Sequence, residues 1–418
     1  MDTRRYFEIL EEIVEASTLK LREDNVRCVN LHVLKVKYTV VVRCNHVNDT
    51  GYTVNNSSNV FCTTNIPSNF CLAQVFYPCK CDEVANIASH LRKLLGTNHP
   101  LLGIARDLIM NSEKPSWGLM VLLVSKAGGR NKNFSDIDKD VTAGVLHSQR
   151  ILGEVTEMIR TSNLLHQGLI SIEDDTKNVQ NMTFGNKIAL LSGDYLLSNS
   201  FRQLACLKHH GLNELMSSAL RDLAENDFIK PRDKHNKALP TKPKPRPKEI
   251  NVPDELGMAF SDFSNFLGNA RTEWMLRSTL GGASLLGKSC KGVLMLAGYG
   301  EDFQRSGYIL GRHLALTLKA TRDYHSVFKN EYISLVSAPV LLYLERHPNF
   351  YSEIERIIDK DDDIDYDDVR NKLQQSSALS DTVTLQNQLC EKTLNILSDF
   401  RDCDAKNALK NIILSIKL

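Results

Sequence analysis

Aspartate is the residue type with the clearest chemical potential in this chain, because clustered carboxylates bind hard divalent cations such as Mg²⁺ through oxygen. The run Asp361-Asp-Asp-Ile-Asp365 has the spacing Asp-Asp-x-x-Asp, in which carboxylates can bridge a metal to phosphate oxygens. However, the run lies on a polar connection and not in a long apolar helix. We predict instead an acidic lead into a helix that begins near Asp367, since carboxylates favour the N-terminal end of a helix. Ile364 and Arg370, at the glycine and glutamate positions of an EF-hand, argue against a calcium loop.

Histidine and cysteine, the other metal-binding residue types, lack the spacing of a metal site. His209-His210 has no cysteine or carboxylate at ligand spacing, which favours a surface pair. Of the 10 cysteines, most fall before residue 82, where Cys79-Lys-Cys81 has the wrong spacing for a zinc knuckle. We expect free thiols in a reducing compartment.

Composition and charge exclude several classes of protein. The hydrophobic fraction is 42% and the charged fraction is 24%, values that are ordinary for a globular protein. The net charge is +1, so no global field would recruit nucleic acid. No run of about 18 apolar residues is present, so we expect no transmembrane segment. Arg4 and Arg5 are followed by several glutamates, and no clear transit or signal peptide is recognised.

Helical periodicity dominates the chain from residue 81 onward, with apolar residues recurring at three-to-four spacing. The pattern predicts helices at about 82–96, around 120–124, at 145–172, 184–204, 212–228, 273–299, 303–328, 330–346 and 383–399, and a short one at the C-terminus. No strand is expected in this part. The predicted fold is therefore all-α, a single large helical bundle.

Two segments depart from this pattern. Residues 1–80 contain a lone strand-like run and an Asn/Ser/Thr-rich stretch, so we predict a divergent and poorly ordered N-terminal segment. Residues 230–254 begin with a stretch rich in lysine and proline, in which helix is excluded because proline lacks the N–H donor. We predict a solvated loop inserted into a helical domain of residues 81–418.

Several strings carry a resemblance to a known family. The stretch Phe184–Leu197 contains Gly185-Asn186 and Gly193-Asp194 and resembles the helix that follows the first aspartate-rich motif of the trans-prenyl diphosphate synthases. Glu157–His166 is similar to the helix that leads into that motif. Leu94–Leu102 and Ser337–Val340 narrow the likeness to the divergent second subunits of decaprenyl diphosphate synthases. The resemblance implies a helical bundle of the isoprenoid synthase type.

The two aspartate-rich motifs that hold magnesium in active members of that family are degenerate here. By the resemblance, the first motif follows His166, and its aspartate positions hold other residues, Gln167, Gly168 and Ser171. At the second motif, Lys319 stands where glutamine is usual, and the aspartate positions hold Arg322, Asp323 and Ser326. Only Asp323 remains a carboxylate.

The family's phosphate-binding cations are also missing. The Lys-Thr pair that grips diphosphate would fall near Gly282-Ala283, and the early Gly-Lys-x-x-Arg-Pro motif is reduced to Lys114-Pro-Ser-Trp-Gly118. The Arg-Arg-Gly that follows the first motif is replaced by the Glu173–Lys177 region. A chain without the metal ligands and without the phosphate cations should not ionise an allylic diphosphate.

The resemblance implies a non-catalytic partner subunit of a heteromeric all-trans polyprenyl diphosphate synthase that makes the ubiquinone side chain. It implies a catalytic subunit as partner, in a heterodimer or heterotetramer, and a mitochondrial location. We expect no cofactor on this chain and Mg²⁺ on the catalytic subunit. The alternative is a divergent prenyltransferase, or an isoprenoid-binding helical protein, that acts alone.

Overall fold

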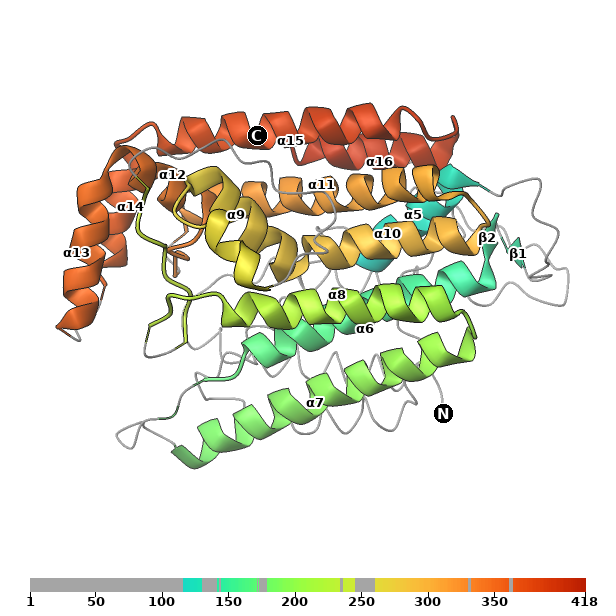
Figure 1. Ribbon diagram of the computed structural model, residues 1–418, viewed down its shortest axis with the longest axis horizontal. Coiled ribbons are helices and arrows are strands. Elements are labelled where there is room, and N and C mark those ends of the chain that lie inside the picture. The colour runs from blue at the N-terminus through green and yellow to red at the C-terminus, as the bar shows by residue number, and fades with distance from the viewer. Residues whose placement is uncertain are drawn as a thin grey trace, which may run out of the picture. The chain divides into compact units, whose positions relative to one another are not determined.

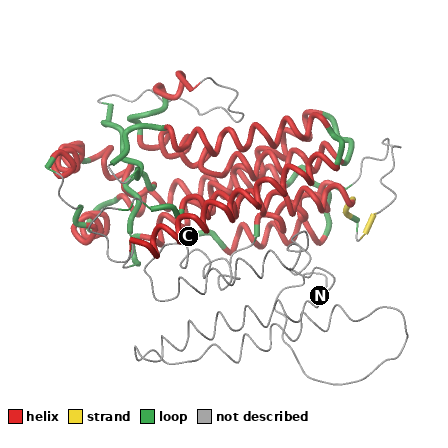
Figure 2. Tube along the Cα trace, turned by 90° about the horizontal axis from the view of Figure 1, so that it is seen from below, coloured by secondary structure: helices red, strands yellow, loops and turns green. Residues whose placement is uncertain are grey.

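The computed structural model describes residues 116–129, 141–142, 144–170, 172, 179–233, 236–244, 260–329, 332–360 and 364–418. Helices account for most of this part of the chain (Figure 2). The all-α prediction is confirmed. The predictions for residues 1–80 and for the helix at 82–96 lie outside the described residues.

The helices of the described chain are shown in Figure 1. Their bounds are α5 Trp117–Gly128, α6 His147–Gln167, α7 Val179–Cys206, α8 His210–Phe228, α9 Ala270–Ser278, α10 Ser284–Leu296, α11 Glu301–Ser326, α12 Ala338–Arg346, α13 Pro348–Asp359, α14 Tyr366–Gln374, α15 Ala378–Leu397 and α16 Asp404–Ser415. A 3₁₀ helix spans Phe260–Asn265, and a π-helical segment, Thr279–Ala283, joins α9 to α10. None of the described helices is both long enough and apolar enough to cross a bilayer.

Three local features differ from the predictions. Two strands of two residues each, β1 Val141–Thr142 and β2 Val145–Leu146, form an antiparallel hairpin with Val141 opposite Leu146. No strand was expected there. The helix predicted at 273–299 is broken by the π-helical segment. The helix predicted at 330–346 begins only at Ala338, because Pro339 fits the first turn of a helix and not its interior.

The described chain falls into two compact units. One contains Thr161–Leu197, and the other contains Pro115–Arg160 and Ser198–Leu418. In the second unit, α11 packs against α10 and α15, and α10 also contacts α8 and α5. Leucines of α10 and α11 are fully buried there, among them Leu286, Leu294, Leu310 and Leu314. Burying each such side chain contributes about 2 kcal/mol, so this helix pair forms the centre of the core.

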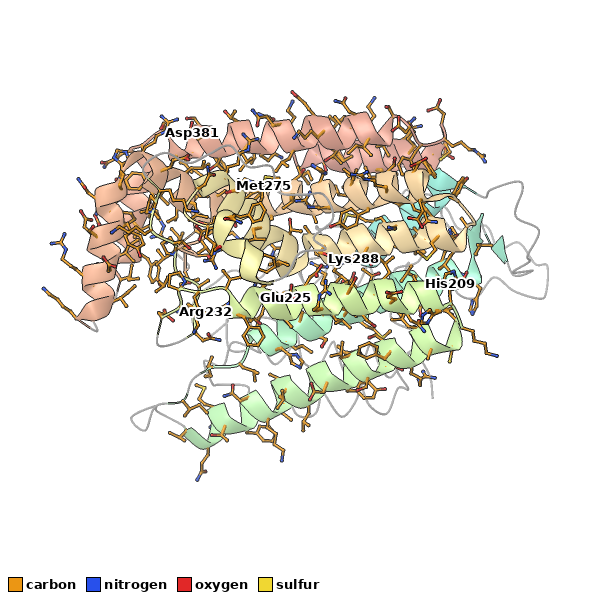
Figure 3. All side chains as sticks on the ribbon, viewed as in Figure 1. His209, Glu225, Arg232, Met275, Lys288 and Asp381 are labelled. Atoms are coloured by element: carbon orange, nitrogen blue, oxygen red, sulfur yellow. The ribbon has the colours of Figure 1, made fainter. Side chains whose placement is uncertain are left out.

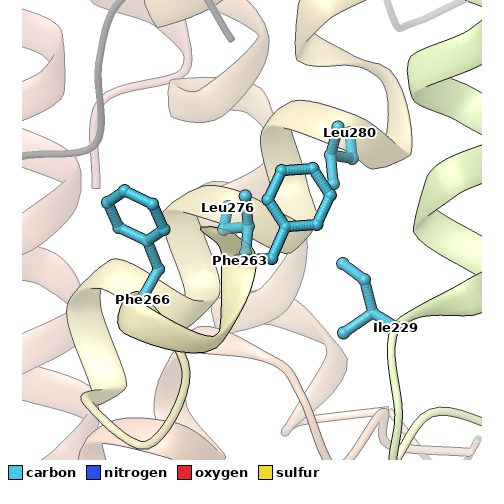
Figure 4. Packing of buried hydrophobic residues seen from close by; sticks show 5 residues of the cluster. All are labelled: Ile229, Phe263, Phe266, Leu276 and Leu280. Carbon is cyan, nitrogen blue, oxygen red and sulfur yellow. The ribbon is translucent and has the colours of Figure 1, made fainter. Parts of the chain in front are cut away.

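The described part of the lysine- and proline-rich segment has no helix, and its side chains are divided between solvent and the core. We call residues 229–233 and 236–244 the strap. At its start, Ile229 packs against Phe263, Leu276 and Leu280 in a buried apolar cluster (Figure 4). Leu239 is also buried. Within the predicted loop, exposed lysines (Lys230, Lys237, Lys242 and Lys244) therefore alternate with an apolar residue, Leu239, that turns inward.

A buried ion pair on α9 holds the strap in place. Arg277 Nε lies 3.0 Å from Glu273 Oε1, and the two side chains are 5% and 1% exposed. The Arg277 guanidinium also donates to the carbonyl oxygens of Leu239 and Lys230, while Glu273 accepts from the backbone N–H and the hydroxyl of Thr241. Each charge thus satisfies strap groups that would otherwise be buried without a partner.

Candidate functional site

His166, near the end of α6, contacts the middle of α7. Its Nε2 lies 3.3 Å from the carbonyl oxygen of Leu190 and 3.3 Å from Oδ1 of Asp194. A Cβ on Gly193 would collide with this imidazole, so only glycine allows the ring to lie there. Ser162 Oγ donates to the Gly193 carbonyl at 2.8 Å. His166 therefore packs against α7, beside Gly193 and Asp194.

The chain that follows α6 is held by a second signature residue of α7. Asn186 accepts from the Ile170 N–H at 3.0 Å and donates to the Ile170 carbonyl at 2.8 Å, which mimics a strand pairing. Gly185 beside it is buried. Gln167 is exposed, Gly168 lies in the turn that ends α6, and Ser171 lies outside the described residues. Asn186 thus holds the backbone that follows α6 in place. The described residues of the first motif provide no carboxylate.

The second motif has one carboxylate, Asp323, whose contacts in the described chain join helices to one another. Oδ2 accepts from the indole N–H of Trp274 at 2.8 Å and from the backbone N–H of Ala338 at 3.0 Å. Oδ1 pairs with the ammonium of Lys319 one turn earlier, at 2.5 Å. The Asp323 side chain is 4% exposed. It binds the N-terminus of α12 to α9 and α11, which is favourable because helix N-termini attract negative charge.

Arg322 and Ser326, the other two residues at the aspartate positions of the second motif, make no contact with the Asp323 carboxylate among its three described donors. Arg322 is exposed, and the Ser326 hydroxyl donates to the carbonyl of Asp323 at 2.7 Å. A Mg²⁺ ion requires several free oxygen ligands in octahedral geometry. Asp323 is engaged by three donors, one of them a cation, so these residues do not fit a magnesium site. No group of three or more histidine, cysteine or acidic side chains with metal-site geometry occurs in the described part of the chain.

The two remnants of the phosphate-binding motifs contact each other. Gly282 lies in the π-helical segment with φ of 151°, a conformation that favours glycine, and a Cβ there would lie 2.9 Å from Cη2 of Trp117. The Arg160 guanidinium stacks over the Trp117 ring at 5.0 Å and pairs with Glu157 at 3.0 Å. Glu157 in turn accepts from the Gly118 N–H at the start of α5. We call this contact region between Trp117 and Gly282 the joint. It is occupied by the Trp117 indole and by the Glu157 carboxylate.

A further buried charge cluster, which the sequence did not predict, joins α8 to α10. Lys288 Nζ lies 2.6 Å from Oδ2 of Asp222, and Ser284 also donates to that oxygen. Burial lowers the pKa of Lys288 and raises the pKa of the nearby Glu225, with the Asp222 charge adding to the latter effect and Arg221 and Lys288 opposing it. Figure 3 shows Lys288 beside Glu225. Helical periodicity does not predict the buried Lys288–Asp222 pair, because it places charged residues on the exposed faces of helices.

The two metal-like motifs of the sequence are helix caps where they are described. Asp365 Oδ1 accepts from the N–H groups of Asp367 and Asp368 at the start of α14, which confirms the predicted acidic lead. Asp361–Asp363 lie outside the described residues. His209 Nδ1 accepts from the Leu212 N–H at the start of α8, so His209 has a structural role.

Comparisons with known proteins decide the family. No family model matches the chain. The chain is 32% identical over 348 residues to a Mus musculus protein named all trans-polyprenyl-diphosphate synthase PDSS2, and the match covers 80% of each chain. This chain belongs to the trans-prenyl diphosphate synthase family.

Other members of the trans-prenyl diphosphate synthase family are more distant. The chain is 26% identical over 373 residues to a probable mitochondrial hexaprenyl pyrophosphate synthase of Neurospora crassa, covering 78% of each chain. Among solved structures, the Caulobacter crescentus polyprenyl synthase in complex with calcium and isoprenyl diphosphate has a TM-score of 0.53. That match covers 81% of this chain and 95% of the other at 16% identity. It confirms the isoprenoid synthase fold.

Proposed function

We propose that this chain is the non-catalytic subunit of a heteromeric all-trans polyprenyl diphosphate synthase whose product becomes the ubiquinone side chain. The observation that carries the proposal is the environment of Asp323. Its carboxylate is fully engaged by Trp274, Ala338 and Lys319. The chain therefore keeps the fold of its family but uses the second motif to join helices.

The joint between Trp117 and Gly282 supports the same proposal. A diphosphate site needs cationic side chains or free backbone N–H groups directed at the phosphate. At this joint the indole of Trp117 contacts the chain at Gly282, and the Arg160 charge is paired with Glu157. The neighbouring N–H of Gly118 is bound by Glu157 as well. The joint thus presents no unpaired cation from these residues to a second substrate.

The partner in this proposal is a catalytic subunit that binds Mg²⁺ and both substrates. Such a subunit would supply the aspartate-rich motifs that are degenerate here. The heteromer would be a dimer or a tetramer in the mitochondrion, where the name of the Neurospora crassa relative places that protein. Retention of Asn186 and Gly193 fits this role, since they position backbone and take no part in chemistry.

Reconstitution tests the proposal. The pure chain, the pure catalytic subunit and their mixture are each incubated with radiolabelled isopentenyl diphosphate, an allylic starter and Mg²⁺. We expect no product from this chain alone and long-chain product from the mixture, together with a stable complex in size-exclusion chromatography. Magnesium-dependent product from the pure chain, or full activity of the mixture without a complex, would overturn the proposal.

A further inference from the structure

Helix α7 exposes large apolar side chains to solvent. Nine such side chains are exposed in the described chain, and four of them lie on α7, namely Val179, Leu190, Leu191 and Phe201. The opposite side of the helix is buried, where Ile188 and Ala189 pack with Leu165 of α6. Large apolar side chains that gather on an exposed face mark an interaction surface.

Three of these side chains lie on one line along α7. Val179, Leu190 and Phe201 are each eleven positions apart, which is close to three full turns of an α-helix. They are 38%, 45% and 43% exposed. Because α7 is one continuous helix (Figure 1), its own geometry fixes their alignment. We call these three residues the α7 row, and the row is about 33 Å long.

The α7 row is poor in charge for an exposed helix face. Between Val179 and Phe201 the charged residues are Lys187 and Asp194 alone. Both are exposed. Solvated helix faces usually carry many charged residues, whereas the centre of a protein interface is depleted of them. The composition of this face is therefore that of an interface.

The spacing of the α7 row is symmetric about Leu190, since Val179 and Phe201 lie equally far on either side of it. Two copies of α7 that pack antiparallel around a twofold axis at Leu190 would place the two Leu190 side chains against each other. Each Val179 would then meet the Phe201 of the second copy. A twofold contact needs such a self-complementary surface, because the same residues serve on both sides.

The two charged residues fit the same antiparallel pairing. Lys187 lies three positions before Leu190 and Asp194 four positions after it, and helical geometry places both along the same side of the row. In the antiparallel pair each Lys187 therefore lies opposite the Asp194 of the second copy. In a parallel pair the same two charges would be about 10 Å apart along the helix axes and would not meet.

We propose that α7 is a self-association surface, on which a second copy of this chain packs antiparallel with Leu190 at the twofold axis. Apolar side chains form the centre of the contact, and the Lys187–Asp194 pairs lie beside it, which is the usual anatomy of a protein interface. The inference does not depend on the proposed function. Combined with it, the inference makes the heteromer a tetramer that contains two copies of this chain.

The mass of the pure full-length chain in solution tests the inference. Sedimentation equilibrium over a range of concentrations should give twice the 47.1 kDa of one chain. Leu190→Asp places two like charges face to face at the centre of the contact, so we expect the dimer to dissociate at least about a hundredfold more readily. The matched control is Leu414→Asp on α16, where the leucine is also 45% exposed, and it should leave the dimer unchanged.

Charge exchange tests the antiparallel arrangement separately. Lys187→Glu alone and Asp194→Lys alone each bring like charges together twice, so each variant should dimerise about fivefold more weakly or worse. Mixing the two variants creates a pair in which both contacts again join opposite charges. We expect the mixture to dimerise like the wild type, a rescue that a merely structural role of either residue would not produce.

Circular dichroism confirms that each variant is folded before its mass is measured. A wild-type chain that stays monomeric at every concentration would overturn the inference, as would a dimer that survives Leu190→Asp or that Leu414→Asp weakens equally. A mixture of the charge variants no more associated than either one alone would overturn the antiparallel arrangement. A monomeric wild type that loses its complex with the catalytic subunit on Leu190→Asp would also overturn self-association, and would leave the proposed function intact.

Discussion

Trp274 of α9 donates its indole N–H to Asp323 of α11 at 2.8 Å, and both side chains are buried. The same carboxylate oxygen accepts the N–H of Ala338, which opens α12. Three helices therefore meet at one carboxylate, at a position that the family resemblance assigns to the second aspartate-rich motif. Asp323 therefore has a structural role in the described chain, and this role leads to the first prediction.

Asp323→Asn should destabilise the chain by about 2–4 kcal/mol, because two N–H donors at this buried position lose a charged acceptor and the Lys319 ammonium loses its counter-charge. Urea unfolding monitored by tryptophan fluorescence measures the loss. Asp402→Asn is the control, since Asp402 also pairs with a lysine one turn away but its side chain is 98% exposed. Equal stability of Asp323→Asn and wild type would show that Asp323 has no structural role.

Gly282→Ala should lower the free energy of unfolding by about 1–3 kcal/mol through two separable effects. The added Cβ strains a backbone with φ of 151° and meets the Trp117 ring at 2.9 Å. In a double-mutant cycle, Trp117→Ala should relieve the collision but not the backbone strain. Unfolding free energies of the four proteins give the coupling, and strictly additive effects would mean that Trp117 and Gly282 do not touch.

Glu154→Gln should change how stability depends on pH. Burial raises the pKa of the Glu154 carboxyl to about 7 from 4.5, against the opposing effect of Arg150. Between these values the folded chain keeps a proton that the unfolded chain releases, so wild-type stability falls as pH rises from 4.5 to 7.

The Gln variant carries no such charge, so its advantage over the wild type should be small at pH 5 and reach about 1 kcal/mol at pH 8. The full shift is discounted because the carboxyl is partly open to solvent. Thermal midpoints at the two pH values measure the difference. An advantage that is the same at both values would contradict a raised pKa.

Glu273→Gln should loosen the strap. Arg277 would lose its buried counter-charge, and Thr241 would lose a charged acceptor. We expect the free energy of unfolding to fall by about 3 kcal/mol. Limited trypsin digestion followed by mass spectrometry should detect faster cleavage after Lys237 than in the wild type. Glu353→Gln, which removes a pair with Lys372 at the surface, is the control. Unchanged cleavage at the strap would mean that the ion pair does not hold it.

The helical part of the fold follows from periodicity alone, because long amphipathic helices repeat their apolar residues. The breaks do not follow in the same way. Apolar residues continue at helical spacing across Thr279–Ala283, so the kink at Gly282 is visible only once Trp117 is placed beside it. Helix α13 is not among the predicted helices, although its sequence has helical periodicity. Its buried residues Phe350 and Ile354 are four positions apart.

The candidate site was predictable to a lesser degree. Residue identities show that Gln167, Gly168 and Arg322 are not carboxylates, and the family resemblance assigns them to aspartate positions. The partners of the surviving Asp323 are not, because Trp274 is 49 residues away and reaches it only in the folded chain. The same holds for the strap, where composition predicts a loop but not the carbonyl groups that Arg277 satisfies.

The most direct test of the central claim, that this chain contributes by association and not by chemistry, is to inactivate the partner. The wild-type chain is mixed with a catalytic subunit whose first aspartate-rich motif is changed to asparagine, and long-chain product from radiolabelled isopentenyl diphosphate is measured. Size-exclusion chromatography confirms that the complex still forms. The account predicts no product from this complex and full activity with the unaltered catalytic subunit. Product formed by the complex with the inactivated partner would mean that this chain carries an active site of its own.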